Sequence, residues 1–192
     1  MKVTFITSNT AKVELAKQRL SKYGIDVVQK NLDLSECRSL DVEEVALDKA
    51  NQALKKSTQP FLVEDSAFYI KSLNGFPGTF INSTFDTLGE RKITDLVKNE
   101  ANKKAIIKSV LIFGDPKTKK LKLFTGIYEG YIAEKPKGVN KRGWKVVRIF
   151  IPKNGSKTLG QLNDAEWQGF LEDFRKNDHF DQFGRWFMKL ID

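Results

Sequence analysis

The stretch Phe61-Leu62-Val63-Glu64-Asp65-Ser66 joins a largely apolar run to two carboxylates and a hydroxyl. The run predicts a short buried strand over residues 61–64. A carboxylate pair where a strand ends is well placed to hold a hard cation such as Mg²⁺, which prefers oxygen ligands. This pattern favours an enzyme that handles phosphates. The alternative is that Asp65 and Ser66 only cap a turn or a helix, as such residues often do.

Strands and helices are predicted to alternate ahead of this stretch. Residues 3–7 alternate as a strand, and apolar residues recur at helical spacing over 13–20. Residues 25–28 predict a second strand, parallel to the first because a helix intervenes. Apolar residues over 42–53 predict a second amphipathic helix. The strand at 61–64 therefore completes another β-α-β unit.

The second half of the chain is patterned differently. Residues 92–99 predict a helix, and 105–113 and 121–133 predict two long strands joined by a Gly-Asp-Pro-Lys turn. These two strands are expected to form an antiparallel hairpin. A further strand is predicted over 148–151, and helical segments over 164–190. The predicted class is α/β with a mixed sheet.

Length and composition limit the number of domains, the cysteine chemistry and the localisation that can be expected. A chain of 192 residues predicts one domain or two closely joined lobes. Cys37 is the only cysteine, which excludes an intramolecular disulfide and a cysteine-based metal cluster. No apolar run approaches the ~20 residues that span a bilayer, and the first residues turn polar too soon for a signal peptide. We therefore expect a cytoplasmic protein without a membrane partner.

The charge is strongly basic, with a formal net value of +9. Such a balance favours polyanionic partners, either nucleic acid or phosphorylated small molecules. One stretch, residues 135–157, contains only basic charges: Lys135, Lys137, Lys141, Arg142, Lys145, Arg148, Lys153 and Lys157. The alternative is a solvated basic face beside a sheet.

An anion site is predicted where the first strand gives way to the first helix. Ser8-Asn9-Thr10-Ala11-Lys12 covers that point, where unpaired N–H groups and the helix dipole attract negative charge. Lys12 adds a full positive charge, although Asn9 could serve only as a helix cap. With the carboxylates at 64 and 65, the combination indicates metal-assisted phosphoryl chemistry. His179, the only histidine, has no second histidine nearby and is expected to be structural or at the surface.

These residues resemble the inosine triphosphate pyrophosphatase family, also called the Ham1 family. The resemblance covers most of the chain and rests on several short motifs in the same order. The main ones are Thr7-Ser8-Asn9-Thr10-Ala11-Lys12, Leu34-Ser35-Glu36, Glu43-Glu44-Val45-Ala46-Leu47-Asp48-Lys49-Ala50, Val63-Glu64-Asp65-Ser66, Leu73-Asn74-Gly75-Phe76-Pro77-Gly78, Gly130-Tyr131-Ile132-Ala133 and Phe150-Ile151-Pro152.

The resemblance implies an elongated mixed β-sheet flanked by helices, with a central cleft between two lobes of a single domain over residues 1–192. It implies a Mg²⁺-dependent enzyme that cleaves nucleoside triphosphates to monophosphates and pyrophosphate and that forms homodimers. Members commonly act on inosine and xanthosine triphosphates.

The resemblance also implies residue roles. Phosphate would be bound by Asn9, Lys12 and Lys49, and Ser8 is also expected to bind substrate. The expected catalytic residues, Glu36 and Asp65, would bind the metal, and Glu64 would support the metal site. Asp65 would also be the base for the attacking water, for which it must lie within hydrogen-bond reach of that water. Ser66 would begin the segment that lines the nucleotide cleft.

The end that recognises the base departs from the family. Where the family has an aromatic residue, glycine, an aromatic residue, aspartate and proline, this chain has Arg142-Gly143-Trp144-Lys145-Val146. For the family's Ser-His-Arg triplet only Phe183-Gly184-Arg185 is matched. Trp144, Lys145 and Arg185 are still predicted to bind substrate. Since lysine only donates hydrogen bonds, and lost polar contacts change discrimination strongly, a shifted base specificity is expected.

Two other functions stay open. The chain could bind nucleic acid or nucleotide through the basic 135–157 stretch, with Trp144 stacking on a base. Against this, Glu36, Glu64 and Asp65 would repel a phosphate backbone. Alternatively, the chain could hydrolyse a phosphoanhydride that is not a nucleotide.

Overall fold

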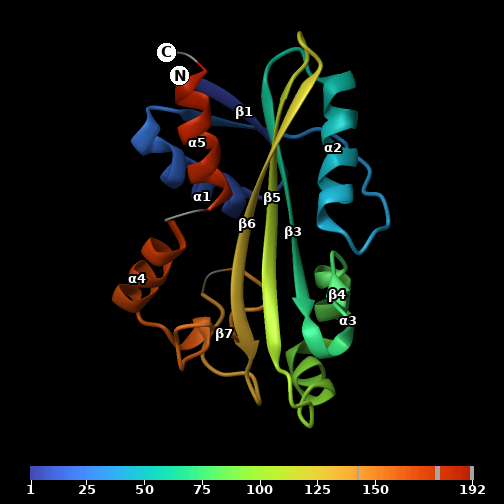
Figure 1. Cartoon of the computed structure of the whole chain (residues 1–192), viewed down its shortest axis with the longest axis vertical. Coiled ribbons are helices and arrows are strands. Elements are labelled where there is room, and N and C mark those ends of the chain that lie inside the picture. The colour runs from blue at the N-terminus through green and yellow to red at the C-terminus, as the bar shows by residue number, and fades with distance from the viewer. Residues whose placement is uncertain (142, 176–177, 191–192) are drawn as a thin grey trace. The chain divides into compact units, whose positions relative to one another are not determined.

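The computed structural model describes residues 1–141, 143–175 and 178–190. Its elements (Figure 1) are β1 (Lys2–Ile6), α1 (Thr10–Leu20), β2 (Asp26–Lys30), α2 (Val42–Lys56), β3 (Phe61–Ile70), β4 (Pro77–Gly78), α3 (Ile81–Leu96), β5 (Lys104–Asp115), β6 (Lys120–Ile132), β7 (Phe150–Pro152), α4 (Asp164–Arg175) and α5 (His179–Lys189). The predicted α/β class is confirmed.

The strands form one mixed sheet in the order β2-β1-β3-β5-β6-β7, and β4 pairs with β3. The strand β1 is parallel to both β2 and β3, which confirms the two predicted β-α-β units. The pairs β6–β7 and β3–β4 are antiparallel. Neighbours β5 and β6 are joined only by residues 116–119, a connection too short for parallel pairing. The predicted hairpin is therefore confirmed.

The chain divides into two compact units. The first contains Met1–Asp65, Ser109–Gly126 and the described part of the C-terminal segment; the second contains Ser66–Lys108 and Ile127–Arg175. Each unit has its own apolar core. The first core includes Phe5, Leu20, Leu62, Phe113, Phe180 and Phe183. The second includes Phe68, Phe85, Ile93, Phe150 and Trp167.

In the first unit, α1 and α5 lie together on one face of the sheet and α2 lies on the other (Figure 1). Close packing of α5 on the 3-10 turn that follows α1 (Ser21–Tyr23) requires Gly184, since a Cβ there would come within 2.3 Å of the Tyr23 ring. The glycine that the sequence matched to a family triplet thus has a local packing role. Helices on both faces bury the strands between them, which is typical of parallel β-α-β units.

The predicted strand boundaries were wrong at the central stretch. The strand β3 runs on to Ile70, so Asp65 and Ser66 lie inside the strand and cap neither a turn nor a helix. The strand continues because buried apolar residues, Ala67 and Phe68, resume directly after the polar positions. The predicted helix at 92–99 overlaps the end of α3, which begins at Ile81 and ends at Leu96, so its start and its end were both placed too late.

In the parts of the chain that the structure covers, every helix is too short or too polar to cross a membrane.

Candidate active site

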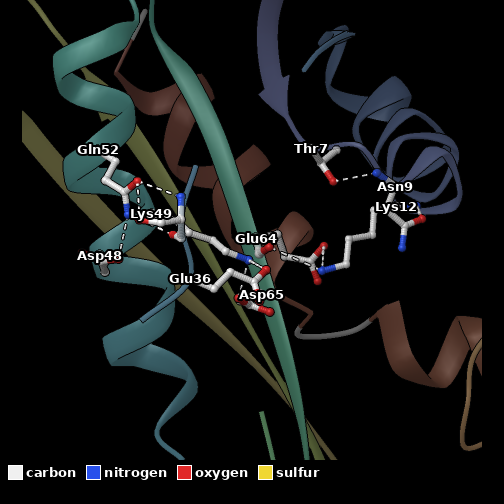
Figure 2. A network of polar contacts seen from close by, with 10 residues as sticks. Thr7, Asn9, Lys12, Glu36, Asp48, Lys49, Gln52, Glu64 and Asp65 are labelled. Carbon is white, nitrogen blue, oxygen red and sulfur yellow. Dashed lines mark hydrogen bonds and ion pairs between the residues drawn. The ribbon is translucent and has the colours of Figure 1, made fainter. Parts of the chain in front are cut away.

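The adjacent carboxylates of β3 face opposite sides of the sheet. Side chains alternate along a strand, so Glu64 points to the face covered by α1 and α5, and Asp65 points to the face covered by α2. Figure 2 shows Glu64 directed toward Lys12, and Asp65 directed toward Lys49. The two acids therefore belong to two separate clusters of charge.

On the α2 side, one ammonium group joins two carboxylates. The Lys49 Nζ lies 2.7 Å from Asp65 Oδ2 and 2.6 Å from Glu36 Oε1 (Figure 2). Burial acts to lower the pKa of Lys49, but the charges and hydrogen bonds of Asp65 and Glu36 outweigh it, and the pKa is raised. Lys49 is thus a fixed positive charge. The predicted meeting of Glu36, Lys49 and Asp65 from three separate segments is observed.

Glu36 lies outside regular structure and is placed by a clamp from α2. The Gln52 side chain accepts from the Ser35 backbone N–H at 2.9 Å and donates to the Ser35 carbonyl at 2.9 Å. Gln52 also donates to Asp48 at 2.7 Å, one turn earlier on α2. Both backbone groups of Ser35, the residue before Glu36, are therefore hydrogen-bonded to Gln52.

Replacing Gln52 with alanine is expected to lower kcat/KM by about 10-fold, the range seen when groups that orient metal ligands are removed. The reason is that Ser35 loses its clamp and Glu36 loses its fixed position. The measurement is steady-state pyrophosphate release from dITP over a range of Mg²⁺ concentrations. Gln59→Ala, an exposed glutamine beyond the end of α2, is the control; equal values for the two variants would show that the clamp has no functional role.

On the other face of β3, Lys12 meets Glu64 beside the start of α1. The Lys12 Nζ lies 3.4 Å from the Glu64 backbone oxygen and 3.6 Å from Glu64 Oε2. Asn9 caps α1, because its Oδ1 accepts from the Lys12 backbone N–H at 3.2 Å. Thr7 Oγ1 in turn accepts from the Asn9 N–H at 3.1 Å, and Ser8 between them is exposed. The capping reading of Asn9 is confirmed, and its role toward phosphate stays a prediction.

His179 belongs to this cluster, which the sequence reading missed. The side chain is buried at the start of α5, with Nε2 3.6 Å from Glu64 Oε1. It was expected to be structural or at the surface because no second histidine lies near it in sequence. Its partner is a glutamate from β3, and only the packing of α5 against the sheet brings the two together.

Acidification is expected to destabilise the protein through this histidine. Burial lowers the pKa of His179 from 6.5, against the opposing charges of Glu64 and Asp178. The His179 imidazole therefore binds a proton more readily in the unfolded chain than in the folded chain. The contribution is fully present above pH 6.5 and is lost as the pH falls below it, by up to about 1.4 kcal/mol per pH unit.

Thermal unfolding at about pH 7.5 and about pH 5.5 measures this effect. The melting temperature should fall on acidification in the wild type and fall less in His179→Gln. The same decrease in both proteins would mean that the buried histidine is not the group responsible.

The α2 side of β3 presents two carboxylates to one positively charged group. Within the described ranges, no group of three or more His, Cys, Asp or Glu side chains is arranged to hold one ion. The carboxylates of Glu36 and Asp65 do converge on one cation, the Lys49 ammonium, because both of them bond to it. Mg²⁺ is commonly held by one or two carboxylates together with substrate phosphates. Glu36 and Asp65 fit that arrangement, whereas Glu64 faces the other side of the strand.

The remaining predicted substrate residues are placed as follows. In the second unit, the Trp144 ring packs edge-on against Trp167, with centroids 5.7 Å apart, and Lys145 forms an ion pair with Asp86. Ser66 also belongs to the second unit. In the first unit, Arg185 on α5 pairs with Asp181. Substrate binding by these four residues stays a prediction.

The basic 135–157 stretch is partly neutralised by the protein itself. Among its described residues, four cations form ion pairs with acidic residues of the same chain. The pairs are Lys145–Asp86, Arg148–Glu90, Lys153–Glu129 and Lys157–Glu166. Arg142 lies outside the described residues. This pairing reduces the charge available for a polyanion.

A hollow of about 440 Å³ lies in the second unit and is lined by Tyr69, Lys71, Lys104 and Tyr131 among others. The predicted site residues do not line it, so it takes no part in the site described above.

This chain is similar to several known proteins in sequence and in fold. Residues 3–170 match the model of the Ham1 family. A protein of Methanopyrus kandleri named dITP/XTP pyrophosphatase is 40% identical over 166 residues, which cover 86% of this chain and 87% of the relative. A Thermococcus kodakarensis protein of the same name is 33% identical over 86% of this chain and 88% of its own length. The Staphylococcus aureus Ham1 protein structure has a TM-score of 0.75 at 21% identity, covering 100% of this chain and 98% of that one. This chain belongs to the Ham1 family.

Proposed function

We propose that this chain is a Mg²⁺-dependent nucleoside triphosphate pyrophosphatase with a shifted base preference. The observation that carries the proposal is the cluster of Glu36, Lys49 and Asp65, in which one ammonium group lies 2.6 Å from a Glu36 oxygen and 2.7 Å from an Asp65 oxygen. The relatives named dITP/XTP pyrophosphatase, at 40% and 33% identity, support the same reaction class.

The site residues of the first unit have different roles in this reaction. Asp65 takes the proton of the attacking water, which requires a carboxylate within hydrogen-bond reach of it. Lys49 and Lys12 bind phosphate oxygens, where their positive charges stabilise charge that develops in the transition state. Held by Glu36 and Asp65, Mg²⁺ would offset the phosphate charge.

The bond that breaks is the phosphoanhydride between the α- and β-phosphates. The water oxygen forms the new bond to the α-phosphorus, and pyrophosphate leaves with the electron pair of the broken bond. The products are one nucleoside monophosphate and one pyrophosphate.

A panel of triphosphates tests the proposal. The intact chain is incubated with dITP, XTP and the canonical nucleotides, with Mg²⁺ or with a chelator, and both products are quantified. We expect monophosphate and pyrophosphate in equal amounts from at least one nucleotide with Mg²⁺ and none with the chelator. If no nucleotide yields pyrophosphate, the proposed function is wrong.

The shifted base preference rests on Lys145. This lysine stands where the family has an aspartate, so a hydrogen-bond acceptor has been replaced by a donor. Lys145→Asp is expected to change the ranking of nucleotides in the panel. An unchanged ranking would remove Lys145 from base recognition.

The nucleic-acid alternative is less well supported, since four cations of the basic stretch are held in ion pairs within the protein. A homodimer also remains a prediction from the family resemblance.

A further inference from the structure

Three polar residues are buried where the start of α5 meets α1. Arg19 is 3% exposed, Asp178 1% and His179 2%. A buried ion pair is a costly way to stabilise a fold, because apolar residues of similar volume often stabilise it as well or better.

One carboxylate ties the two helices together. The Asp178 Oδ2 lies 3.1 Å from Arg19 Nε on α1. The Asp178 Oδ1 accepts from the Asp181 backbone N–H at 2.6 Å and so caps α5. The first turn of α5 is therefore fixed in direction and in distance from α1.

The next residue along the chain lies beside the carboxylate that meets Lys12. The His179 Nε2 lies 3.6 Å from Glu64 Oε1, and the other oxygen, Glu64 Oε2, lies 3.6 Å from Lys12 Nζ. The Glu64 side chain is only 6% exposed, so the histidine and the lysine lie beside a carboxylate that is largely shielded from solvent. Lys12 and Arg19 lie about two turns apart on α1. The contacts therefore run from Lys12 through Glu64, His179 and Asp178 to Arg19, and α1 joins the two ends.

We propose that the Arg19–Asp178 ion pair and His179 are positioning residues that hold Glu64, and through it the Lys12 ammonium, at the start of α1. This inference rests on the proposed function. Lysine has a long flexible stem and a compact charge, and a fixed carboxylate beside it restricts where that charge can lie. Lys12 is then ready to meet a phosphate group that approaches the N–H groups of α1.

The test uses inorganic tripolyphosphate without metal as the probe, so that it does not depend on turnover. Its dissociation constant is measured by calorimetry for the whole chain and for the double variant Arg19→Met with Asp178→Ser. This variant removes both charges together, and serine keeps a helix cap. We expect the protein to stay folded and to bind the probe about 10-fold more weakly.

Two further variants sharpen the test. Lys22→Met is the matched control, since it breaks a different ion pair to α5, Lys22–Asp181, and should leave binding unchanged. Glu64→Gln separates positioning from simple charge: losing a negative charge near an anion should tighten binding, whereas losing the group that holds Lys12 should weaken it about 10-fold. This second variant decides the matter if the double variant fails to fold.

The outcomes separate this inference from the proposed function. A wild-type chain that binds tripolyphosphate yet hydrolyses no nucleotide contradicts the proposed function and leaves the binding test in force. Unchanged binding in a folded double variant, tighter binding in Glu64→Gln, or no binding by the wild type would each overturn the positioning role.

Discussion

Replacing Asp65 with asparagine is expected to lower kcat by about 10³-fold, the size of effect found for a general base, with little loss of stability. Asparagine keeps the shape of the side chain but neither accepts a proton from water nor attracts a cation. Lys49 retains Glu36 as a partner at 2.6 Å, so no uncompensated charge is left. The measurement is the single-turnover rate of pyrophosphate release together with the melting temperature.

Asp26→Asn is a suitable control, because Asp26 is an exposed carboxylate in the same unit, at the start of β2. Activity of the Asp65 variant close to that of this control would remove Asp65 from catalysis. Loss of the folded state in the Asp65 variant alone would assign Asp65 a structural role.

Replacing Lys49 with methionine is expected to have two opposite effects. Turnover should fall by about 10²-fold, since a positive charge aimed at the reacting phosphates is lost. Binding of Mn²⁺ in the absence of nucleotide should become tighter, because the ammonium group that shares the oxygens of Glu36 and Asp65 is gone. Steady-state kinetics and Mn²⁺ titration followed by electron paramagnetic resonance measure the two effects.

The control is Lys55→Met, an exposed lysine in the last turn of the same helix. Weaker or unchanged Mn²⁺ binding in the Lys49 variant would mean that the ion does not use the carboxylates that Lys49 bridges. Unchanged turnover would mean that the ammonium does not act on substrate.

Local patterns predicted the parallel β-α-β units well, because strand and helix periods are properties of neighbouring residues. The pairing of Asp65 with Glu36 and Lys49 came from family motifs, since the three residues share no local pattern. The opposite directions of Glu64 and Asp65 follow from strand alternation. They were missed because the strand was expected to end at residue 64, and two adjacent acids at an end can face one ion.

Contacts between segments that lie far apart in the sequence could not be predicted from local patterns. Gln52 reaches Ser35 only because an irregular segment folds back over α2. His179 reaches Glu64, and Asp178 reaches Arg19, only because α5 packs beside α1. In each case the decisive distance depends on how elements pack, which periodicity and residue type do not encode.

Glu36 and Asp65 are proposed to hold a divalent ion together against a triphosphate. Anomalous scattering from Mn²⁺ tests this arrangement directly, in crystals soaked with the α,β-methylene analogue of dITP, which resists cleavage at the reacting bond. We expect the Mn²⁺ peak within bonding distance of carboxylate oxygens from both Glu36 and Asp65. A peak on Glu64, or analogue bound without any metal near Asp65, would contradict the account.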